Sequence, residues 1–121
     1  MRKILLIDDL RNFREPFADA ELTIARTSKQ GLAAIELGVA ADFVWDEIWF
    51  DHDLGEPEGV LDTTMPVVDY LSELAYFDNP VKVSKVVVHT SNSVGRDQIV
   101  QSLRHYGYNV TSVDAKIFFI V

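Results

Sequence analysis

Short apolar runs alternate along the chain with segments in which apolar residues recur at helical spacing. Lys3–Ile7, Glu47–Asp51 and Lys85–His89 are nearly continuous apolar runs, whereas Glu21–Thr27 alternates between apolar and polar residues. Continuous runs are typical of strands buried on both faces of a parallel sheet. We therefore predict four strands in these segments, with the alternating one near an edge of the sheet.

The segments that follow these runs predict three helices. Ser28 can cap a helix that extends to about Gly38, because serine favours the N-cap position. Pro66 suits the first turn of a second helix, which Asn79–Pro80 ends. Val94–Tyr106 has the spacing of a third helix.

The remaining segments complete an alternating order of strands and helices. His52–Thr64 is rich in Gly, Pro and acidic residues and predicts a loop, while Asn109–Val113 and Lys116–Val121 are further strand candidates. Alternation indicates βαβ units with right-handed crossovers, so we expect helices on both faces of the sheet. We predict one α/β domain over residues 1–121, a three-layer αβα sandwich with a doubly wound, mainly parallel five-stranded sheet.

The composition narrows the class of protein further. The chain has 121 residues, no cysteine and a formal net charge of −8, so we expect no disulfide framework and no general nucleic-acid binding. The apolar run before Asp8 is too short for a signal peptide or a transmembrane helix, so a cytoplasmic location without membrane contact is the expectation. Residues 30–81 hold no Lys or Arg, which fits either an acidic soluble surface or carboxylates that bind a divalent cation.

Polar residues directly follow three of the predicted strands. They are the clusters Asp8–Asp9, Asp51–Asp53 and His89–Asn92. In open parallel sheets the ligand crevice lies beyond the carboxyl ends of the strands. We therefore expect the three clusters to meet at one edge of the sheet and to form the functional site.

The carboxylates at this edge are candidate metal ligands. Asp8 and Asp9 are adjacent and repel each other unless a cation neutralises them, and Mg²⁺ prefers oxygen ligands. Asp51 is a third ligand or a nucleophile, and Asp53 points to the same side if the strand continues. The expected cofactor is a divalent metal, Mg²⁺ or Mn²⁺; turn formation or capping is the alternative role for these residues.

Two histidines lie in the same clusters: His52 stands between Asp51 and Asp53, and His89 precedes the polar residues Thr90–Asn92. A histidine titrates near neutral pH and can act as a general acid or base. Hydrolysis requires one group that activates water and another that protonates the leaving group, which the two histidines can supply, and Asp51 is a possible nucleophile. Asp51, His52 and His89 are therefore the candidate catalytic residues. The alternatives are that the histidines ligate a transition metal or are structural.

The polar residues after the fourth predicted strand form a candidate phosphate site. Thr90, Ser91 and Asn92 precede a helix, whose N-terminus offers free N–H groups and the positive end of the helix dipole. Arg96 adds a fork of donors, and Arg11 can reach the same anion from the first loop. Ordinary N-capping is the alternative explanation for the Ser and Asn residues.

The spacing of these motifs resembles receiver domains, in which acids after the first and third strands hold magnesium and the strand-three aspartate accepts a phosphoryl group. A closer resemblance is to the cyclic-phosphate processing receiver domain, carried by Asp8–Asn12, Asp51–Gly55 and His89–Arg96. It covers roughly Met1–Gly107. The resemblance implies a receiver/flavodoxin-like fold and the processing of a cyclic phosphate.

The chain departs from signalling receivers in two segments, and the position of Lys116 is open. Leu10–Ala20 is too short for a full receiver first helix, so we expect a shortened one. The apolar segment Ile117–Val121 replaces the final receiver helix; we expect it to be buried, or to be an association surface if exposed. Lys116 lies near the site if Asn109–Val113 is the fifth strand, and at the opposite end if Ile117–Val121 is that strand.

The leading functional hypothesis is a metal-dependent phosphoesterase that hydrolyses a cyclic phosphate or a related small phosphoester. The expected partner is a small phosphorylated molecule, and the protein is expected to be a monomer or homodimer. The alternative is a non-catalytic receiver-like module that accepts a phosphoryl group, binds a phosphorylated ligand or contacts another protein.

Overall fold

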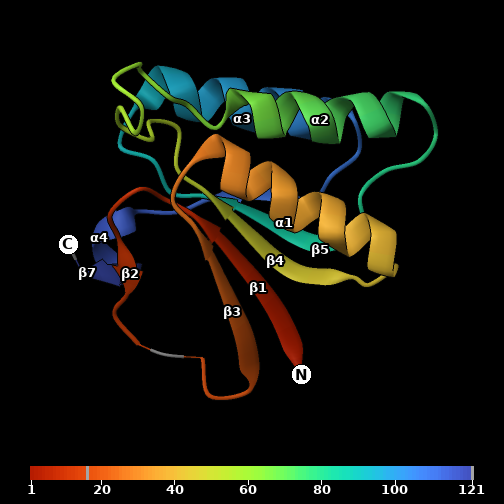
Figure 1. Cartoon of the computed structure of the whole chain (residues 1–121), viewed down its shortest axis with the longest axis horizontal. Helices are drawn as coiled ribbons and strands as arrows, with labels where there is room; N and C mark the ends of the chain where they lie inside the picture. The colour runs from red at the N-terminus through yellow and green to blue at the C-terminus, as the bar shows by residue number, and fades with distance from the viewer. Residues whose placement is uncertain (16, 121) are drawn as a thin grey trace.

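A five-stranded parallel sheet forms the centre of the computed structural model, which describes residues 1–15 and 17–120 (Figure 1). Its strands are β1 (Arg2–Ile7), β3 (Ala20–Ala25), β4 (Trp45–Phe50), β5 (Val83–Val88) and β6 (Val110–Ser112). They lie in the order β3-β1-β4-β5-β6, and every neighbouring pair is parallel. The predicted receiver/flavodoxin-like α/β class is confirmed, and β3 lies at an edge.

Three helices cover one face of this sheet (Figure 1). They are α1 (Ser28–Ala41), α2 (Met65–Tyr76) and α3 (Ser93–His105). From β3 to β6 the chain crosses the sheet in a single direction, so right-handed crossovers place all three helices on the same side. The larger apolar core lies between these helices and the sheet.

The opposite face is covered differently from the expectation. The connection from β1 to β3 runs the other way across the sheet and therefore lies on this face. Its described residues form the short strand β2 (Asn12–Phe13), not the shortened helix that we predicted. A stretch this short is stabilised instead by pairing: β2 lies antiparallel to β7 (Phe119–Ile120).

The C-terminal segment also differs from the continuous strand predicted over Lys116–Val121. Asp114 caps a single helical turn, α4 (Ala115–Phe118), by accepting a hydrogen bond from the Lys116 backbone N–H at 2.9 Å. Only β7 is extended, and Val121 lies outside the described residues. Burial is likewise partial: Phe119 is buried, whereas Ile117 is 66% exposed.

The start of α1 corrects one sequence assignment. Thr27, not Ser28, is the N-cap, because the Thr27 side chain accepts the Gln30 N–H. Ser28 is buried and bonds Asp62 through both its N–H and its hydroxyl, at 2.9 and 2.7 Å. This pair fixes the loop that precedes α2 against the start of α1. No helix in the described part of the chain combines the length and the apolar character that crossing a membrane requires.

Candidate functional site

Three side chains from three different strand ends form a buried cluster. Asp8, Asp51 and His89 each offer one ligand atom, and these atoms all lie within 4.8 Å of one another. The residues are 0%, 7% and 0% exposed, respectively. Buried ionisable side chains need partners, so their convergence marks this edge of the sheet as the candidate site.

Strand periodicity explains why these residues meet. Successive side chains alternate between the faces of a sheet, so Asp8 shares a face with Leu6, and His89 shares one with Val87. Leu6 and Val87 belong to the apolar cluster on the face opposite the helices. The hydrogen bonds between β4 and β1 continue one residue past the end of β4, since the Asp51 N–H donates to the carbonyl of Ile7 at 2.9 Å.

Asp8 is held as a carboxylate by several donors. Its Oδ1 accepts the backbone N–H groups of Leu10 and Arg11 at 2.9 and 2.8 Å, and its Oδ2 lies 2.9 Å from His89 Nε2. Burial by itself raises the pKa of Asp8, but the hydrogen bond with His89 and those from the backbone outweigh it and lower the pKa to about 2. Asp8 is therefore an anion at neutral pH.

Asp51 is shifted in the opposite direction. Burial and the nearby charge of Asp8 raise its pKa above the ordinary value. Arg11 compensates in part, because its Nη1 lies 3.5 Å from one oxygen of Asp51 and 3.5 Å from one oxygen of Asp8. The pair of carboxylates thus has an unmet demand for positive charge.

A polar pocket of about 450 Å³ opens beside His89. Its lining residues are Arg11, His89, Thr90, Ser91, Arg96, Ser112, Val113, Asp114, Ala115 and Lys116. Three of them are cationic and three carry hydroxyl groups, a composition that suits an anion with several oxygens. Lys116 lies here because β6 ends at Ser112, which settles the alternative that the sequence left open.

Three of the predicted site residues form a separate, outer cluster. His52 Nδ1 lies 3.0 Å from Asp53 Oδ1, and the Asn92 amide donates to Asp53 Oδ2 at 3.2 Å. Asn92 also caps α3 by accepting the Gly95 N–H at 3.0 Å. The structure does not bring His52 or Asp53 into the buried cluster, and Asn92 does not line the pocket.

Asp9 also lies apart from the buried cluster. It follows Asp8 by one residue and therefore faces the other side of the sheet, where its Oδ2 is close to Gly55. Gly55 has φ of +70°, which favours glycine and lets the loop pass this carboxylate closely. The four carboxylates expected from the sequence are thus reduced to two that share a site.

The buried cluster fits a divalent cation. Two carboxylates suit Mg²⁺ or Mn²⁺, which prefer oxygen ligands, and the imidazole of His89 adds a nitrogen that transition metals accept. The adjacent negative charges of Asp8 and Asp51 attract a cation to this position. The residues that would hold the ion are therefore Asp8 and Asp51, with His89 as a third ligand or as the partner that orients Asp8.

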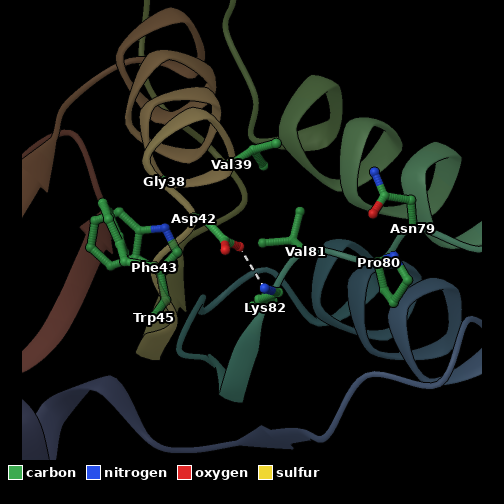
Figure 2. Close-up of a pocket in the computed structure, with 9 residues that line it drawn as sticks. All are labelled: Gly38, Val39, Asp42, Phe43, Trp45, Asn79, Pro80, Val81 and Lys82. Atoms are coloured by element: carbon green, nitrogen blue, oxygen red, sulfur yellow. Dashed lines mark hydrogen bonds and ion pairs between the residues drawn. The ribbon is translucent and has the colours of Figure 1, made fainter.

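A second hollow, of about 210 Å³, lies at the opposite end of the strands (Figure 2). It is lined by the end of α1 and by the segments that lead into β4 and β5. Its two charged residues, Asp42 and Lys82, already pair with each other across the hollow (Figure 2). It lacks the excess charge of the pocket beside His89, so the candidate site is the latter.

Sequence reasoning missed two features of the site. Ser112 lines the pocket because β6 pairs with β5 in a register that places it beside Val88. Phe119 packs against the His89 ring, with centroids 4.5 Å apart. The position of Ser112 at the end of a predicted strand was a usable signal; the contact of Phe119 depends on a pairing that the sequence pattern did not indicate.

The family model described as the cyclic-phosphate processing receiver domain matches residues 3–105. No curated protein and no solved structure matches the chain significantly. The matched range includes the strand ends that carry the buried cluster, and Lys116 lies beyond it.

Proposed function

The chain belongs to the cyclic-phosphate processing receiver family, and from this premise we propose that it is a metal-dependent phosphoesterase that hydrolyses a cyclic phosphate or a related small phosphoester. One observation carries the proposal: a buried cluster of Asp8, Asp51 and His89 adjoins a pocket lined by three cationic side chains. A carboxylate cluster beside an anion pocket is the arrangement that metal-assisted phosphoester hydrolysis requires.

The proposed roles follow the position of each side chain. Asp8 and Asp51 hold Mg²⁺ or Mn²⁺, which supplies Lewis-acid polarisation of a phosphoryl oxygen when bound. Thr90 and Ser91 donate hydrogen bonds to the phosphate, together with the cationic side chains of the pocket. His89 borders both the cluster and the pocket and is the group that delivers a proton to the leaving alkoxide.

The reaction is a balanced hydrolysis. Water attacks phosphorus, one P–O bond of the ring breaks, and the phosphate is left as a monoester. The attacking water loses a proton to a carboxylate of the cluster, and the alkoxide that leaves gains one from His89. His52, Asp53 and Asn92 have a positioning role, since they join the loop after β4 to the start of α3, which carries Arg96.

Turnover of a panel of cyclic phosphates with Mg²⁺ and Mn²⁺ tests this function. We expect Asp51→Ala to lower the rate by about 100-fold or more, the typical effect of removing one preorganised transition-state contact. The matched control is Asp69→Asn, an exposed carboxylate on α2 outside the pocket. Wild-type turnover no greater than that of Asp51→Ala would refute the proposal for the substrates used.

A second candidate function is that of a phosphoacceptor, which the receiver family favours. Asp51 directly follows β4 and lies near Asp8, and a carboxylate in this position can attack phosphorus. Acetyl phosphate or beryllium fluoride would then alter the intrinsic fluorescence of Trp49, whose side chain lies on the same strand, in a magnesium-dependent way. Loss of that response in Asp51→Asn, without cyclic-phosphate turnover in the wild type, would favour this alternative.

A further inference from the structure

One cation, the guanidinium of Arg11, lies between the two carboxylates that we propose as metal ligands. Its Nη1 is 3.5 Å from Asp8 Oδ2 and 3.5 Å from Asp51 Oδ2. A metal ion shared by these two oxygens would lie closer to each of them, at about 2 Å, and therefore within a few ångströms of the guanidinium. The side chain is 22% exposed, so it is largely enclosed with its partners.

Arg11 and a divalent cation therefore compete for the same two carboxylates. Asp8 and Asp51 are buried, so water and salt screen the charges between them weakly. Two cations within a few ångströms repel strongly in such surroundings. Binding of a divalent ion therefore disfavours the contacts of the guanidinium with both carboxylates.

The anion pocket lies next to the Arg11 side chain and offers it a different partner. The backbone of Arg11 is held on both sides: its N–H donates to Asp8 Oδ1 at 2.8 Å, and its carbonyl accepts from Arg26 Nη1 at 2.7 Å. The backbone can therefore stay in place while the side chain changes partners. Arg11 also lines the anion pocket, together with Arg96 and Lys116.

We infer that Arg11 exchanges partners: it pairs with Asp8 and Asp51 in the metal-free protein, and with the phosphate once a divalent cation has taken its place. This inference rests on the proposed function, because it requires the carboxylates to hold the metal and the pocket to hold the phosphate. Arg11 then couples binding of the metal ion to binding of the phosphate. The metal ion displaces Arg11 toward the phosphate, and the phosphate draws Arg11 away from the carboxylates that bind the metal ion. The coupling is reciprocal, and metal raises phosphate affinity by the same factor as phosphate raises metal affinity.

Binding measurements on the full chain test the exchange without any turnover. Mn²⁺ is titrated alone, and inorganic phosphate is titrated with and without saturating Mn²⁺, by calorimetry. We expect Arg11→Gln to bind Mn²⁺ roughly tenfold more tightly than the wild type in the absence of phosphate, within the usual range of coupling between sites. We also expect phosphate to gain less from Mn²⁺ in this variant than in the wild type.

Two further variants separate the exchange from a general loss of positive charge. Arg96 is a cation of the same pocket, but it pairs with Asp97 and not with Asp8 or Asp51. Arg96→Gln should therefore weaken phosphate binding and leave Mn²⁺ affinity unchanged. Arg11→Lys keeps the charge and should bind Mn²⁺ with nearly wild-type affinity. Circular dichroism of each variant confirms that it is folded.

The outcomes distinguish this inference from the proposed function. Mn²⁺ affinity in Arg11→Gln equal to or weaker than that of the wild type would overturn the exchange, even if cyclic phosphates are hydrolysed. Absence of Mn²⁺ binding in the wild type and in Arg11→Gln would overturn both the exchange and the metal site. Tighter Mn²⁺ binding in Arg11→Gln without turnover of any cyclic phosphate would support the exchange and count against the phosphoesterase.

Discussion

His89 Nε2 and Asp8 Oδ2 lie 2.9 Å apart, although their strands, β5 and β1, are not neighbours in the sheet. The strand between them, β4, ends at Phe50, and Asp51 follows it. The His89–Asp8 contact therefore spans the end of β4 and encloses Asp51 in the cluster. Both partners are 0% exposed, which makes this contact the one on which the geometry of the site depends.

Removal of the imidazole should destabilise the protein. In His89→Leu the buried Asp8 carboxylate loses the nearer of its two side-chain partners and keeps only the longer contact with Arg11. A hydrogen bond to a charged group is worth about 1.5–3 kcal/mol. We expect a loss of about 2 kcal/mol in the free energy of unfolding, measured by urea denaturation in the presence of a chelator. His105→Leu, at an exposed position near the end of α3, is the control and should change stability by about 0.5 kcal/mol or less.

The environment of the Tyr108 hydroxyl leads us to expect a decline in the free energy of unfolding at alkaline pH. Its hydroxyl donates to the carbonyl of Leu71 at 2.8 Å and accepts the Val81 N–H at 3.1 Å, and burial raises its pKa above 10. The folded state keeps the proton where the unfolded chain has lost it. This contribution to stability is therefore complete below the unfolded pKa and declines as the pH rises through the folded pKa.

Denaturation of Tyr108→Phe across pH 9–12 is the measurement for this prediction. The variant should lack that part of the alkaline decline, and at neutral pH it should be about 1–3 kcal/mol less stable, because two backbone groups lose their partner. Tyr76→Phe removes a hydroxyl from a side chain that is 71% exposed and should leave both quantities unchanged. A wild-type alkaline profile in Tyr108→Phe would contradict the assignment.

Much of the site was predictable because it depends on strand ends, which local sequence patterns identify. Asp8, Asp51 and His89 each follow an apolar run, and parallel strands bring their carboxyl ends together. The sequence pattern did not show that Asp9 and Asp53 lie outside this buried cluster. Which side a residue faces depends on where the strand stops and the turn begins, and Asp53 already pairs with Thr63 across the loop.

The short strands β2 and β7, on the face of the sheet opposite the helices, were not predictable in the same way. A short segment with Phe13 indicates neither a helix nor a strand by itself, and β2 exists because it pairs with a segment more than 100 residues away. Once paired, Phe13 and Phe119 stack with centroids 4.8 Å apart, and Phe13 meets the Trp49 ring edge-on at 5.0 Å. Long-range aromatic packing of this kind leaves no periodic signal.

Substitutions at two helical glycines, Gly95 and Gly38, separate a loss of stability from an effect on the site. A Cβ at Gly95 would overlap the His52 ring, and one at Gly38 would lie 2.8 Å from Trp45 Nε1. Gly95→Ala and Gly38→Ala should each lower stability by about 1–3 kcal/mol, as overpacking usually does. Only Gly95→Ala should also weaken phosphate binding, because the displaced His52 disturbs the start of α3. Equal phosphate affinity in the two variants, measured by calorimetry, would contradict a positioning role for His52.

Lys116 should contribute to phosphate affinity through charge rather than through a fixed hydrogen bond. Its side chain lines the pocket from α4, and the residue is exposed. An exposed cation near an anion acts over a distance and is screened by salt. Lys116→Gln should therefore weaken binding of inorganic phosphate by roughly 3- to 5-fold at low ionic strength, corresponding to about 1 kcal/mol or less, and this difference from the wild type should shrink at 0.5 M salt. Lys29→Gln, whose charge pairs with Glu58 away from the pocket, should show no such difference at either salt concentration. A salt-independent loss in Lys116→Gln would instead indicate a direct, enclosed contact with the anion.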